Sequence, residues 1–423
     1  MEKSPVPVLR PVAGGRMLAR IEGRVVFVAG AIPGEEVRVR VTRETRQAVW
    51  ADAVEIVTPS PDRRDPLADP ACGGLAYAHI RYERQVQLKS EVIADAFRRI
   101  GSITLDAAPV VAPSPETAYR LRARLHVRGG RAGFFRTGTH DLCDAGATGQ
   151  LGPDGMAAVE RTVQSLGSRA AECEAVVVAE NVAASERVLH LEARDGARLD
   201  DLSRQLALPE GVDGLTTAIR GRTITLAGAA SVTDNASQVF GGAPPISSPI
   251  SWSRKASSFF QGNRYLLGDL VRRVLDLGHA DRFVDLYSGV GLFAVALAGH
   301  GAAGHAVEGD RSSGSDLDAN AAPWRDRLTV VHAPVEYFVT HRIDPVPAVV
   351  ILDPPRTGVS ADALAALLRW NVPRVVYVSC DPPTLARDAS RIIRAGYTLT
   401  SLDAFDFFPN TPHVETVVCF SKP

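Results

Sequence analysis

This 423-residue sequence contains little lysine and has almost no net charge. Only four of its 47 basic residues are lysine. The resulting arginine bias suits bidentate contacts with phosphate, although genome-wide codon composition explains it better. The formal net charge of −1 excludes a chain that holds nucleic acid by bulk charge alone, and it stays compatible with a local basic face.

Membrane-spanning runs and secretion signals are also missing. Glycine and histidine interrupt the most apolar stretch, residues 292–307, and the first five residues contain no apolar signal region. The cysteines are odd in number and dispersed, which excludes a secreted scaffold stapled by disulfides. We therefore expect a cytoplasmic monomer without membrane contacts and with unpaired thiols at Cys72, Cys143, Cys173, Cys380 and Cys419.

The length predicts about three domains, and a hydrophobic fraction of 45% is ordinary for globular proteins. Residues 1–60 alternate apolar and polar side chains between glycine and proline turns, which predicts a small all-β barrel of the oligonucleotide-binding (OB) type. Tyr82 to Ile100 has the apolar spacing of one amphipathic helix. Residues 61–76 and 108–245 mix strand and helix patterns, and we interpret them as an α+β central domain that faces RNA.

From about residue 246 the pattern changes. Near-continuous apolar strands alternate with helical stretches, which predicts a parallel sheet covered on both faces, a doubly wound α/β domain of the Rossmann type. We assign residues 77–107 and 246–423 to this domain. Two final strand-like runs, from Tyr397 and from His413, predict an antiparallel addition at the sheet edge.

Two features at the start of this domain predict a nucleoside-cofactor site. The first strand runs into a turn with Gly289 and Gly291, and a helix follows, so that a ligand can approach backbone amides. About 20 residues on, Glu308 ends the second strand, where a carboxylate can take both ribose hydroxyls. An ordinary strand–turn–helix with a surface glutamate is the alternative.

Acidic, thiol and imidazole side chains accompany the later strands. Asp353 and Cys380 each come at the end of a buried strand, and a Pro-Pro pair follows closely and makes the loop rigid. His413 and Glu415 open the closing strand. Because a thiol is the most nucleophilic side chain near neutral pH, Cys380 at a ligand crevice indicates covalent catalysis. A buried structural cysteine is the alternative.

Five motifs, in this order, resemble those of the S-adenosylmethionine-dependent RNA uracil-5-methyltransferases. They are Phe260-Gln261-Gly-Asn263, Asp285-Leu-Tyr-Ser-Gly-Val-Gly291, Asp353-Pro-Pro-Arg356-x-Gly358, Ser379-Cys380-Asp-Pro382 and His413-Val-Glu415. Residues 15–34 are similar to the family's RNA-binding TRAM barrel, and residues 119–126 resemble its central region. The resemblance thus spans nearly the whole chain.

The resemblance implies a covalent mechanism. The thiolate of Cys380 adds to C6 of a uracil, C5 takes the methyl group of S-adenosylmethionine, and Glu415 as general base removes the C5 proton so that Cys380 is released. The uridine must lie in a loop or be flipped out of a helix to reach this site. The family's cofactor residues map onto Gln261, Tyr287, Gly289, Gly291, Glu308 and Asp353.

An arginine strip is the predicted RNA surface. Alternate residues of a strand at 119–128 are basic and share one face, with aromatic residues nearby for base stacking. A solvated strand face is the alternative. The resemblance adds Arg356 and His413, near the catalytic residues, as substrate or supporting contacts. The TRAM-like barrel resembles the ribosomal RNA branch of the family more than the transfer RNA branch. The candidate RNA contacts are Arg120, Arg122, Arg124, Phe134, Arg356 and His413.

Many members of this family hold an iron–sulfur cluster with a Cys-x5-Cys-x2-Cys run before the long helix and a fourth cysteine further on. Here only Cys72 matches, Leu75 takes the third position, and Cys143 falls several residues before the expected fourth, near Thr148. We therefore expect no iron–sulfur cluster and no other metal. A further departure is the run at 332–334, which lacks the carboxylate often found near the adenine.

Two other functions are alternatives. Methyltransferases of exocyclic amines in nucleic acids also carry an acid or amide before Pro-Pro, but they need an aromatic residue where Arg356 stands, and no cysteine. A non-catalytic RNA-binding or chaperone protein with a vestigial methyltransferase domain would not need to keep Cys380 and Glu415.

Overall fold

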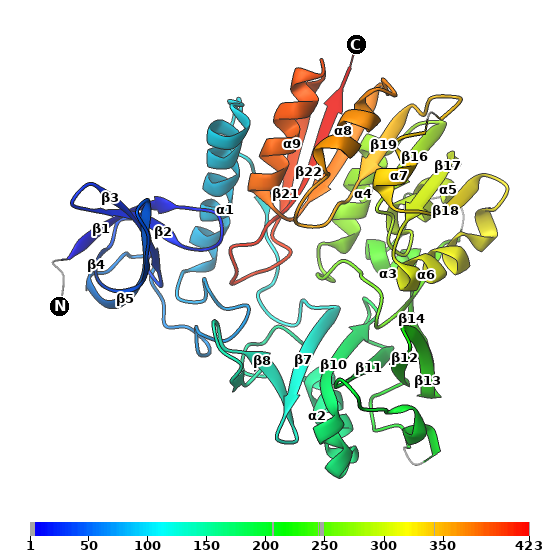
Figure 1. Ribbon diagram of the computed structural model, residues 1–423, viewed down its shortest axis with the longest axis horizontal. Coiled ribbons are helices and arrows are strands. Elements are labelled where there is room, and N and C mark those ends of the chain that lie inside the picture. Colours follow the sequence, from blue (N-terminus) through cyan, green and yellow to red (C-terminus); the bar gives the residue numbers. More distant parts are fainter. Residues whose placement is uncertain (1–4, 205–206, 244, 246–248, 342, 423) are drawn as a thin grey trace.

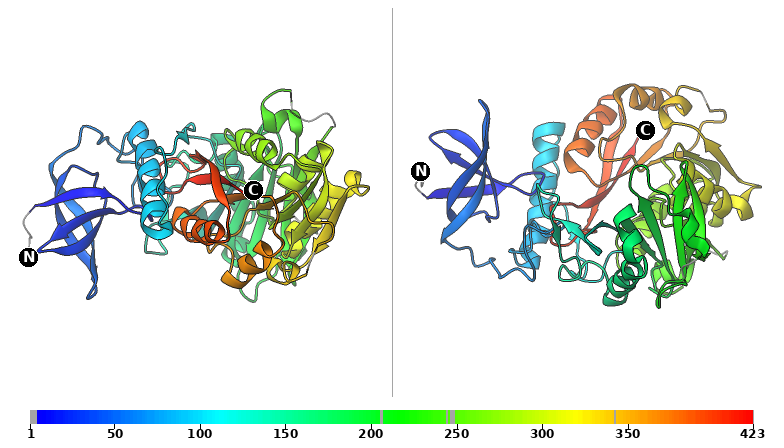
Figure 2. Two further views of the ribbon diagram at one scale, coloured as in Figure 1. Left: turned by 90° about the horizontal axis from the view of Figure 1, so that it is seen from above. Right: turned by 60° about the horizontal axis from the view of Figure 1, so that its bottom comes forward.

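The computed structural model describes residues 5–204, 207–243, 245, 249–341 and 343–422. It contains an N-terminal barrel, a central sheet and a larger α/β unit (Figure 1). Helix α1 (Tyr82–Ala96) stands between the barrel and the α/β unit, as the two further views in Figure 2 also show. None of the described helices has the length and apolarity needed to cross a membrane.

Five strands close the N-terminal barrel, in the order β1 (Val6–Pro11), β2 (Met17–Ile21), β3 (Arg24–Ala29), β5 (Ala48–Thr58) and β4 (Glu36–Glu44). Val26 and Val28 of β3 are buried in its core, because alternate side chains of a strand face the same side. The all-β barrel is confirmed. The alternation is interrupted in β2, where three successive residues, Met17 to Ala19, are all buried.

Helix α1 packs on both neighbours. Leu88 belongs to the barrel core, whereas Ile93 and Ala96 belong to the core of the α/β unit. The helix predicted up to Ile100 changes at its end into one π-helical turn, Phe97–Gly101. There the chain runs so close to helix α9 (Pro382–Arg394) that a Cβ on Gly101 would lie 3.0 Å from a carbonyl oxygen of α9.

The central sheet has seven strands, in the order β13 (Arg222–Gly228), β12 (Gly214–Ile219), β11 (Arg187–Ala193), β10 (Cys173–Glu180), β7 (Arg122–Arg128), β8 (Arg131–Phe135) and β9 (Leu142–Cys143). Helix α2 (Pro153–Ser165) and the 3₁₀ turns Gly167–Glu172 and Asp200–Arg204 accompany it. Leu125 and Val127 of β7 share a core with α2, so the arginines of β7 face the other side. The ribbon β14 (Ser231–Asn235) and β15 (Ser251–Lys255), with helix α3 (Ala236–Phe240), leads to the last unit.

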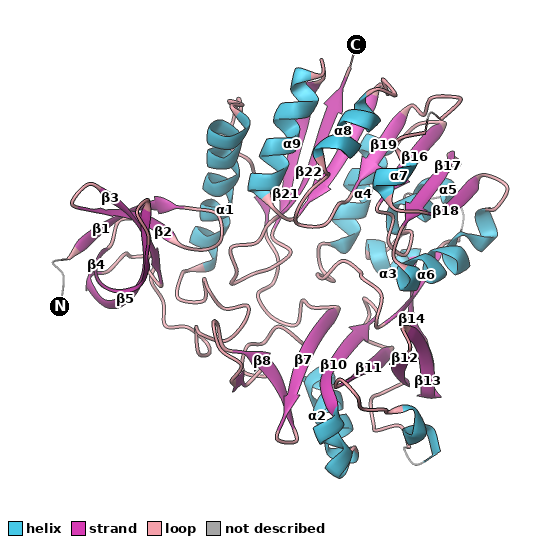
Figure 3. Ribbon diagram, viewed as in Figure 1, coloured by secondary structure: helices cyan, strands magenta, loops and turns pink. Residues whose placement is uncertain are grey.

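The α/β unit is an eight-stranded sheet, in the order β18 (Leu328–His332), β17 (Ala303–Glu308), β16 (Arg282–Leu286), β19 (Val349–Leu352), β20 (Arg374–Ser379), β22 (Glu415–Ser421), β21 (Thr398–Phe405) and β6 (Val111–Ala112). Helices α4 (Leu267–Gly278), α5 (Leu292–Gly299) and α6 (Arg311–Ala321) pack on one face. Helices α1, α7 (Val335–Phe338), α8 (Ala361–Leu368) and α9 pack on the other (Figure 3), and a 3₁₀ turn, Ala322–Trp324, follows α6.

Neighbouring residues of one strand reach opposite cores in this unit. Val375 of β20 packs with α8 and α9, and Val376 packs with α4 and α5. Burial on both faces explains the near-continuous apolar strands, and the doubly wound α/β fold is confirmed.

The expected antiparallel addition is present, and one further short strand lies outside it. Strand β22 lies between β20 and β21, antiparallel to both, and the edge is formed by β6, which is parallel to β21. Val111–Ala112, expected in the central domain, therefore pairs with the α/β sheet. The start of β22 consequently lies at the edge where the parallel strands end.

Candidate active site

The predicted catalytic residues meet at the carboxyl ends of the parallel strands, where open α/β sheets bind ligands. Asp353 directly follows β19, and Cys380 directly follows β20. Strand β22 is antiparallel to β20, and the ladder pairs Ser379 with Thr416. Cys380 follows Ser379, and Glu415 precedes Thr416. Because the two strands are antiparallel, these two residues lie side by side just beyond that pair.

Of the acidic side chains of the site, Glu415 is buried and Asp353 is half-buried. Glu415 is 3% exposed, and burial together with the nearby Asp353 raises its pKa, while the Arg356 guanidinium opposes the shift. Burial also raises the pKa of Asp353, which accepts a hydrogen bond from Nε2 of Gln261 at 3.1 Å. A carboxylate with a raised pKa is a stronger base than an exposed glutamate, which suits proton abstraction near neutral pH.

Cys380 is a free and half-buried thiol. Burial raises the pKa of Cys380 to about 12, and the neighbouring carboxyl groups of Glu415 and Asp353 act in the same direction. The Arg356 guanidinium opposes them with its charge and with a hydrogen bond. Because the thiolate is the nucleophilic form, the reactivity of Cys380 depends on this cation.

His413, on the loop before β22, lies beside Arg356, which comes from the loop after β19. Its Nε2 is 3.5 Å from Nη2 of Arg356, and its ring meets the ring of Phe408 edge-on, with centroids 6.1 Å apart. Burial, followed by the charge of Arg356, lowers the pKa of His413 to about 4. His413 is therefore neutral near pH 7, with one ring nitrogen able to donate and the other able to accept a hydrogen bond.

A pocket adjoins Asp353 at the glycine turn after β16. Gly289 and Gly291 have φ angles of +58° and +90°, which side chains other than glycine rarely adopt, and the space beside Gly289 is open. Beneath the turn, Oδ2 of buried Asp285 accepts hydrogen bonds from Ser288 and from the first turn of α5. The residues that line the pocket are Phe259, Phe260, Gln261, Tyr287, Ser288, Gly289, Val290, Leu292, Phe293 and Asp353.

Two further carboxylates lie at this turn. Glu308, at the end of β17, accepts hydrogen bonds from the backbone N–H groups of Gly289 at 2.7 Å and of Asp310 at 2.6 Å. Tyr287 donates its hydroxyl to Oε1 of Glu336, on α7, at 3.1 Å. Sequence reasoning missed Glu336 because it follows, by two residues, the run at 332–334 where a carboxylate was expected.

These groups fit the predicted cofactor. The open glycine turn, the ring of Tyr287, Gln261 and Asp353 line one pocket, and Glu308, a carboxylate that can bind a ribose, is hydrogen-bonded to the backbone of the same turn. Four of the six predicted cofactor residues, Gln261, Tyr287, Gly289 and Asp353, thus line the pocket, while Glu308 contacts Gly289 from beside it and Gly291 ends the turn before α5.

Two arginines of the predicted RNA strip are occupied within the protein. Nε of Arg122 donates to the carbonyl oxygen of Ala256 at 3.1 Å, and burial lowers its pKa. Arg124 forms ion pairs with Glu174 at 2.9 Å and with Glu192 at 2.6 Å. As a phosphate surface, the strip is therefore weaker than the sequence indicates.

Arg120, by contrast, lies toward the catalytic residues. Its Nε donates to Oε1 of Gln150 at 2.7 Å, and its guanidinium carbon is 6.0 Å from the ring centroid of Phe408. Phe408 is also the ring that meets His413. Arg120, Phe408, His413 and Arg356 therefore connect the central sheet with the surroundings of Cys380.

The aromatic residue beside the arginines is Phe135 and not Phe134. Phe135 stacks on His126, with ring centroids 3.6 Å apart and planes 9° apart. Phe134 packs on the opposite side, against the core beneath α2. Alternate residues of β8 face opposite sides of the sheet, so choosing Phe134 selected the buried side.

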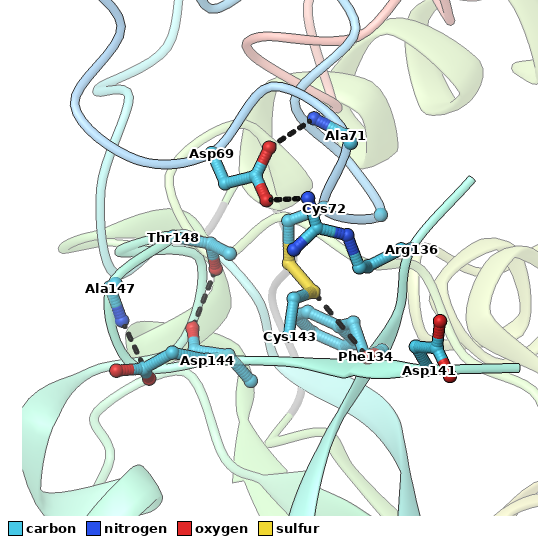
Figure 4. Close-up of a disulfide and its surroundings, with 12 residues drawn as sticks. Asp69, Ala71, Cys72, Phe134, Arg136, Asp141, Cys143, Asp144, Ala147 and Thr148 are labelled. Atoms are coloured by element: carbon cyan, nitrogen blue, oxygen red, sulfur yellow. Dashed lines mark hydrogen bonds and ion pairs between the residues drawn. A yellow bond between two sulfur atoms is a disulfide. The ribbon is translucent and has the colours of Figure 1, made fainter. Parts of the chain in front are cut away.

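Cys72 and Cys143 are bonded to each other as a disulfide, with Cα atoms 5.7 Å apart (Figure 4). The expectation of two ordinary thiols was wrong, because no local pattern shows that these residues, 71 positions apart, are neighbours. The bond joins the segment before α1 to β9, and an ion pair of 2.6 Å between Asp69 and Arg136 lies beside it. In the part of the chain that the structure describes, no three His, Cys, Asp or Glu side chains gather as potential metal ligands.

Comparison with known families gives two matches. Residues 346–423 match the model of tRNA (Uracil-5-)-methyltransferase, and residues 4–54 match the TRAM domain.

Several relatives are similar over nearly their whole length. An uncharacterized RNA methyltransferase of Corynebacterium efficiens is 30% identical over 99% of this chain and 94% of its own. The 23S rRNA (uracil(1939)-C(5))-methyltransferase of Azoarcus sp. is 30% identical, with 97% of both chains covered. Its counterpart in Methylococcus capsulatus is 31% identical, over 100% of this chain and 99% of its own.

Among solved structures, the tRNA (uracil-54, C5)-methyltransferase of Pyrococcus abyssi in complex with S-adenosyl-L-homocysteine has the same fold. The TM-score is 0.75 at 23% identity, and the match covers 98% of this chain and 99% of that one.

Proposed function

This chain belongs to the family of S-adenosylmethionine-dependent RNA uracil-5-methyltransferases, and on that premise we propose that it methylates its uridine through a covalent bond between Cys380 and C6 of the base. The supporting observation is the meeting of Cys380 and Glu415 at the ends of two paired strands, beside the cofactor pocket. S-adenosylmethionine supplies an electrophilic methyl group on a positively charged sulfur.

Cys380 makes the target carbon nucleophilic. The Sγ thiolate adds to C6, and the electron pair of the C5–C6 double bond moves to C5 and the neighbouring carbonyl. C5 thereby gains the electron density that it needs to take the methyl group, while the bond between that methyl group and the sulfonium sulfur breaks and the electron pair stays on the sulfur, which becomes a neutral thioether. Arg356 favours the thiolate before this addition, since its charge opposes the upward shift of the Cys380 pKa.

Glu415 completes the reaction as general base. It removes the proton from C5, the electron pair restores the C5–C6 double bond, and the bond between C6 and Sγ breaks to release Cys380 as a thiolate. The burial that raises the pKa of Glu415 makes it a competent acceptor of this proton. Gln261 and Asp353 orient the reacting end of the cofactor, while Tyr287, Glu308 and the glycine turn hold its nucleoside.

The uridine enters this site unstacked, since its C5 and C6 atoms cannot be reached within a helix. Arg120, Arg356 and His413 are the proposed contacts of the flipped nucleotide, because they lie where the central sheet meets the catalytic loop.

We infer that the substrate is ribosomal RNA. The barrel matches the TRAM domain, and two relatives at 30–31% identity over nearly the whole chain are named 23S rRNA methyltransferases. Mapping of 5-methyluridine in a deletion strain tests this. Loss of one 5-methyluridine from ribosomal RNA supports the inference, and loss from transfer RNA alone overturns it.

Paired variants test the catalytic roles. Cys380→Ala is expected to abolish methyl transfer while cofactor binding persists. Glu415→Gln is expected to transfer the methyl group and then stall, so that a covalent protein–RNA species accumulates on uridine-containing RNA and migrates slowly in a denaturing gel. Full turnover by Cys380→Ala would end the covalent mechanism, and a Glu415→Gln variant without the slow species would remove Glu415 as the base.

A further inference from the structure

The loop between β21 and β22 leads directly into the proposed base. It runs from Asp406 to Val414, it carries His413, and Glu415 follows it. Asp406 and Phe407 are 0% exposed and Asn410 is 4% exposed, so the loop is buried although it has no regular secondary structure. Its position is therefore set by what packs against it.

Helix α1 holds the beginning of this loop through a buried ion pair. The side chains of Lys89 and Asp406 are both 0% exposed, and Nζ of Lys89 donates to a carboxylate oxygen of Asp406. The same Nζ donates to the carbonyl oxygen of Phe408 at 3.0 Å. One amine thus fixes two residues of the loop.

One turn earlier on α1, Gln85 binds the middle of the loop both as hydrogen-bond acceptor and as donor. Its Oε1 accepts the backbone N–H of Asn410 at 2.9 Å, and its Nε2 donates to Oδ1 of Asn410 at 2.9 Å. Arg64 donates to the same Oδ1 at 2.9 Å, and the backbone N–H of Tyr77 donates to the carbonyl oxygen of Asn410 at 2.8 Å. Asn410 has a φ of +63°, so these bonds hold a left-handed residue in place.

The barrel touches the loop from a further side. A Cβ on Gly15, in the turn between β1 and β2, would lie 2.9 Å from Cγ of Pro412. Pro412 immediately precedes His413. The loop is thereby enclosed by α1, by the segment before it and by the barrel.

We propose that Gln85 and Lys89 are positioning residues for the methyl transfer, which hold the loop 406–414 so that His413 and Glu415 face Cys380. This inference rests on the proposed role of Glu415 as the base. Buried polar and charged pairs contribute less to stability than apolar packing of the same volume would, but their hydrogen bonds have a defined direction. That direction is what a base needs when it must lie within hydrogen-bonding reach of one proton.

The test compares two glutamines of the same helix. Gln85→Met removes the bonds to Asn410, together with those from Nε2 to the carbonyl oxygens of Tyr77 and Ile80, and it keeps the volume and the helix propensity. Gln87→Met makes the same change two residues further on, where the side chain is exposed and accepts a hydrogen bond from Arg84 of the same helix at 3.1 Å. We expect Gln85→Met to lower kcat at least tenfold with little change in the KM for RNA, and Gln87→Met to turn over normally.

The decisive readout is the step that fails. Gln85→Met should bind S-adenosylhomocysteine and form the covalent adduct with 5-fluorouridine RNA as the unchanged protein does, and on uridine RNA it should accumulate the same covalent species as Glu415→Gln. A folded Gln85→Met protein with normal kcat, or one that is slow without accumulating that species, overturns the inference. If Glu415→Gln itself accumulates none, it is the assignment of the base that fails.

A second variant tests the ion pair between Lys89 and Asp406 without leaving an unpaired buried charge. Lys89→Met combined with Asp406→Leu removes both charges together and replaces them with apolar side chains. We expect this double variant to fold and to accumulate the covalent species as Gln85→Met does. Normal turnover in the double variant would show that the loop needs no contact from Lys89.

Discussion

Arg356 and Cys380 illustrate how single side chains set the chemistry of the site. Burial, Glu415 and Asp353 raise the pKa of the Cys380 thiol to about 12, and Arg356 lowers it. Removing the cation in Arg356→Met raises the thiol pKa further, so the thiolate fraction at a given pH falls. We expect adduct formation with 5-fluorouridine RNA to slow about tenfold near neutral pH, the effect of one pKa unit, and its pH profile to move to higher pH.

Arg356→Lys is the matched control, because it keeps the charge and loses the planar guanidinium. It should retain most of the wild-type pH profile. An Arg356→Met protein whose adduct formation has the wild-type pH dependence would contradict the role of the cation.

Asp285 gives a prediction about stability. Burial raises its pKa from 3.8 to about 7. A carboxyl group whose folded pKa lies above its unfolded value stabilises the fold fully at pH values below the unfolded pKa, and that contribution is lost as the pH rises through the folded pKa. The melting temperature should therefore fall between about pH 4 and about pH 7, and less steeply in Asp285→Asn. Over that range the free energies of unfolding of the two proteins should diverge by at most about 4 kcal/mol.

The amide oxygen introduced by Asp285→Asn can still accept the hydrogen bonds from Ser288 and Ala294. Thermal melts of both proteins without ligand, at several pH values, provide the measurement. Parallel curves would show that Asp285 does not titrate in this range.

At the scale of elements, the parallel strands and the residues that follow them could be predicted, and the contacts between distant segments could not. Strands β19 and β20 are apolar and buried along nearly their whole length, so their pattern is strong, and Asp353 and Cys380 follow them directly. Strand β22 begins with Glu415, and only its pairing with β20 puts that residue beside Cys380. Phe134 was chosen over Phe135 because the sequence does not show which face of β8 is covered by α2.

The disulfide between Cys72 and Cys143 joins two elements that lie far apart in the sequence. A bond that closes a loop of 71 residues restricts the unfolded chain and is worth about 4 kcal/mol in the loop-entropy model. We expect Cys72→Ser with Cys143→Ser to lower the melting temperature. Adding a dithiol reductant should lower the melting temperature of the unchanged protein and leave that of the double variant unaltered.

Thiol counting provides the control. The denatured, unreduced protein should expose three reactive thiols, those of Cys173, Cys380 and Cys419. Five reactive thiols, or equal melting temperatures for the two proteins, would contradict the bond.

At the scale of the whole molecule, all three units meet at the loop 406–414. Gly15 of the barrel lies against Pro412, Arg120 of the central region lies near Phe408, and α1 holds Asn410 through Gln85. The catalytic residues could be predicted from motifs, but Gln85 could not, because its partner is 325 positions away in the sequence. The arrangement explains why the family resemblance extends over the whole chain and not over the α/β unit alone.

Peptide mapping of the protein after reaction with 5-fluorouridine RNA and S-adenosylmethionine tests the covalent mechanism most directly. Fluorine at C5 cannot leave as a proton does, so the reaction stops after methyl transfer with the RNA still attached. We predict a single modified peptide, in which Cys380 carries a nucleotide with one added methyl group, and no adduct in Cys380→Ala. Attachment at another residue, or 5-methyluridine formed by Cys380→Ala, would contradict the mechanism.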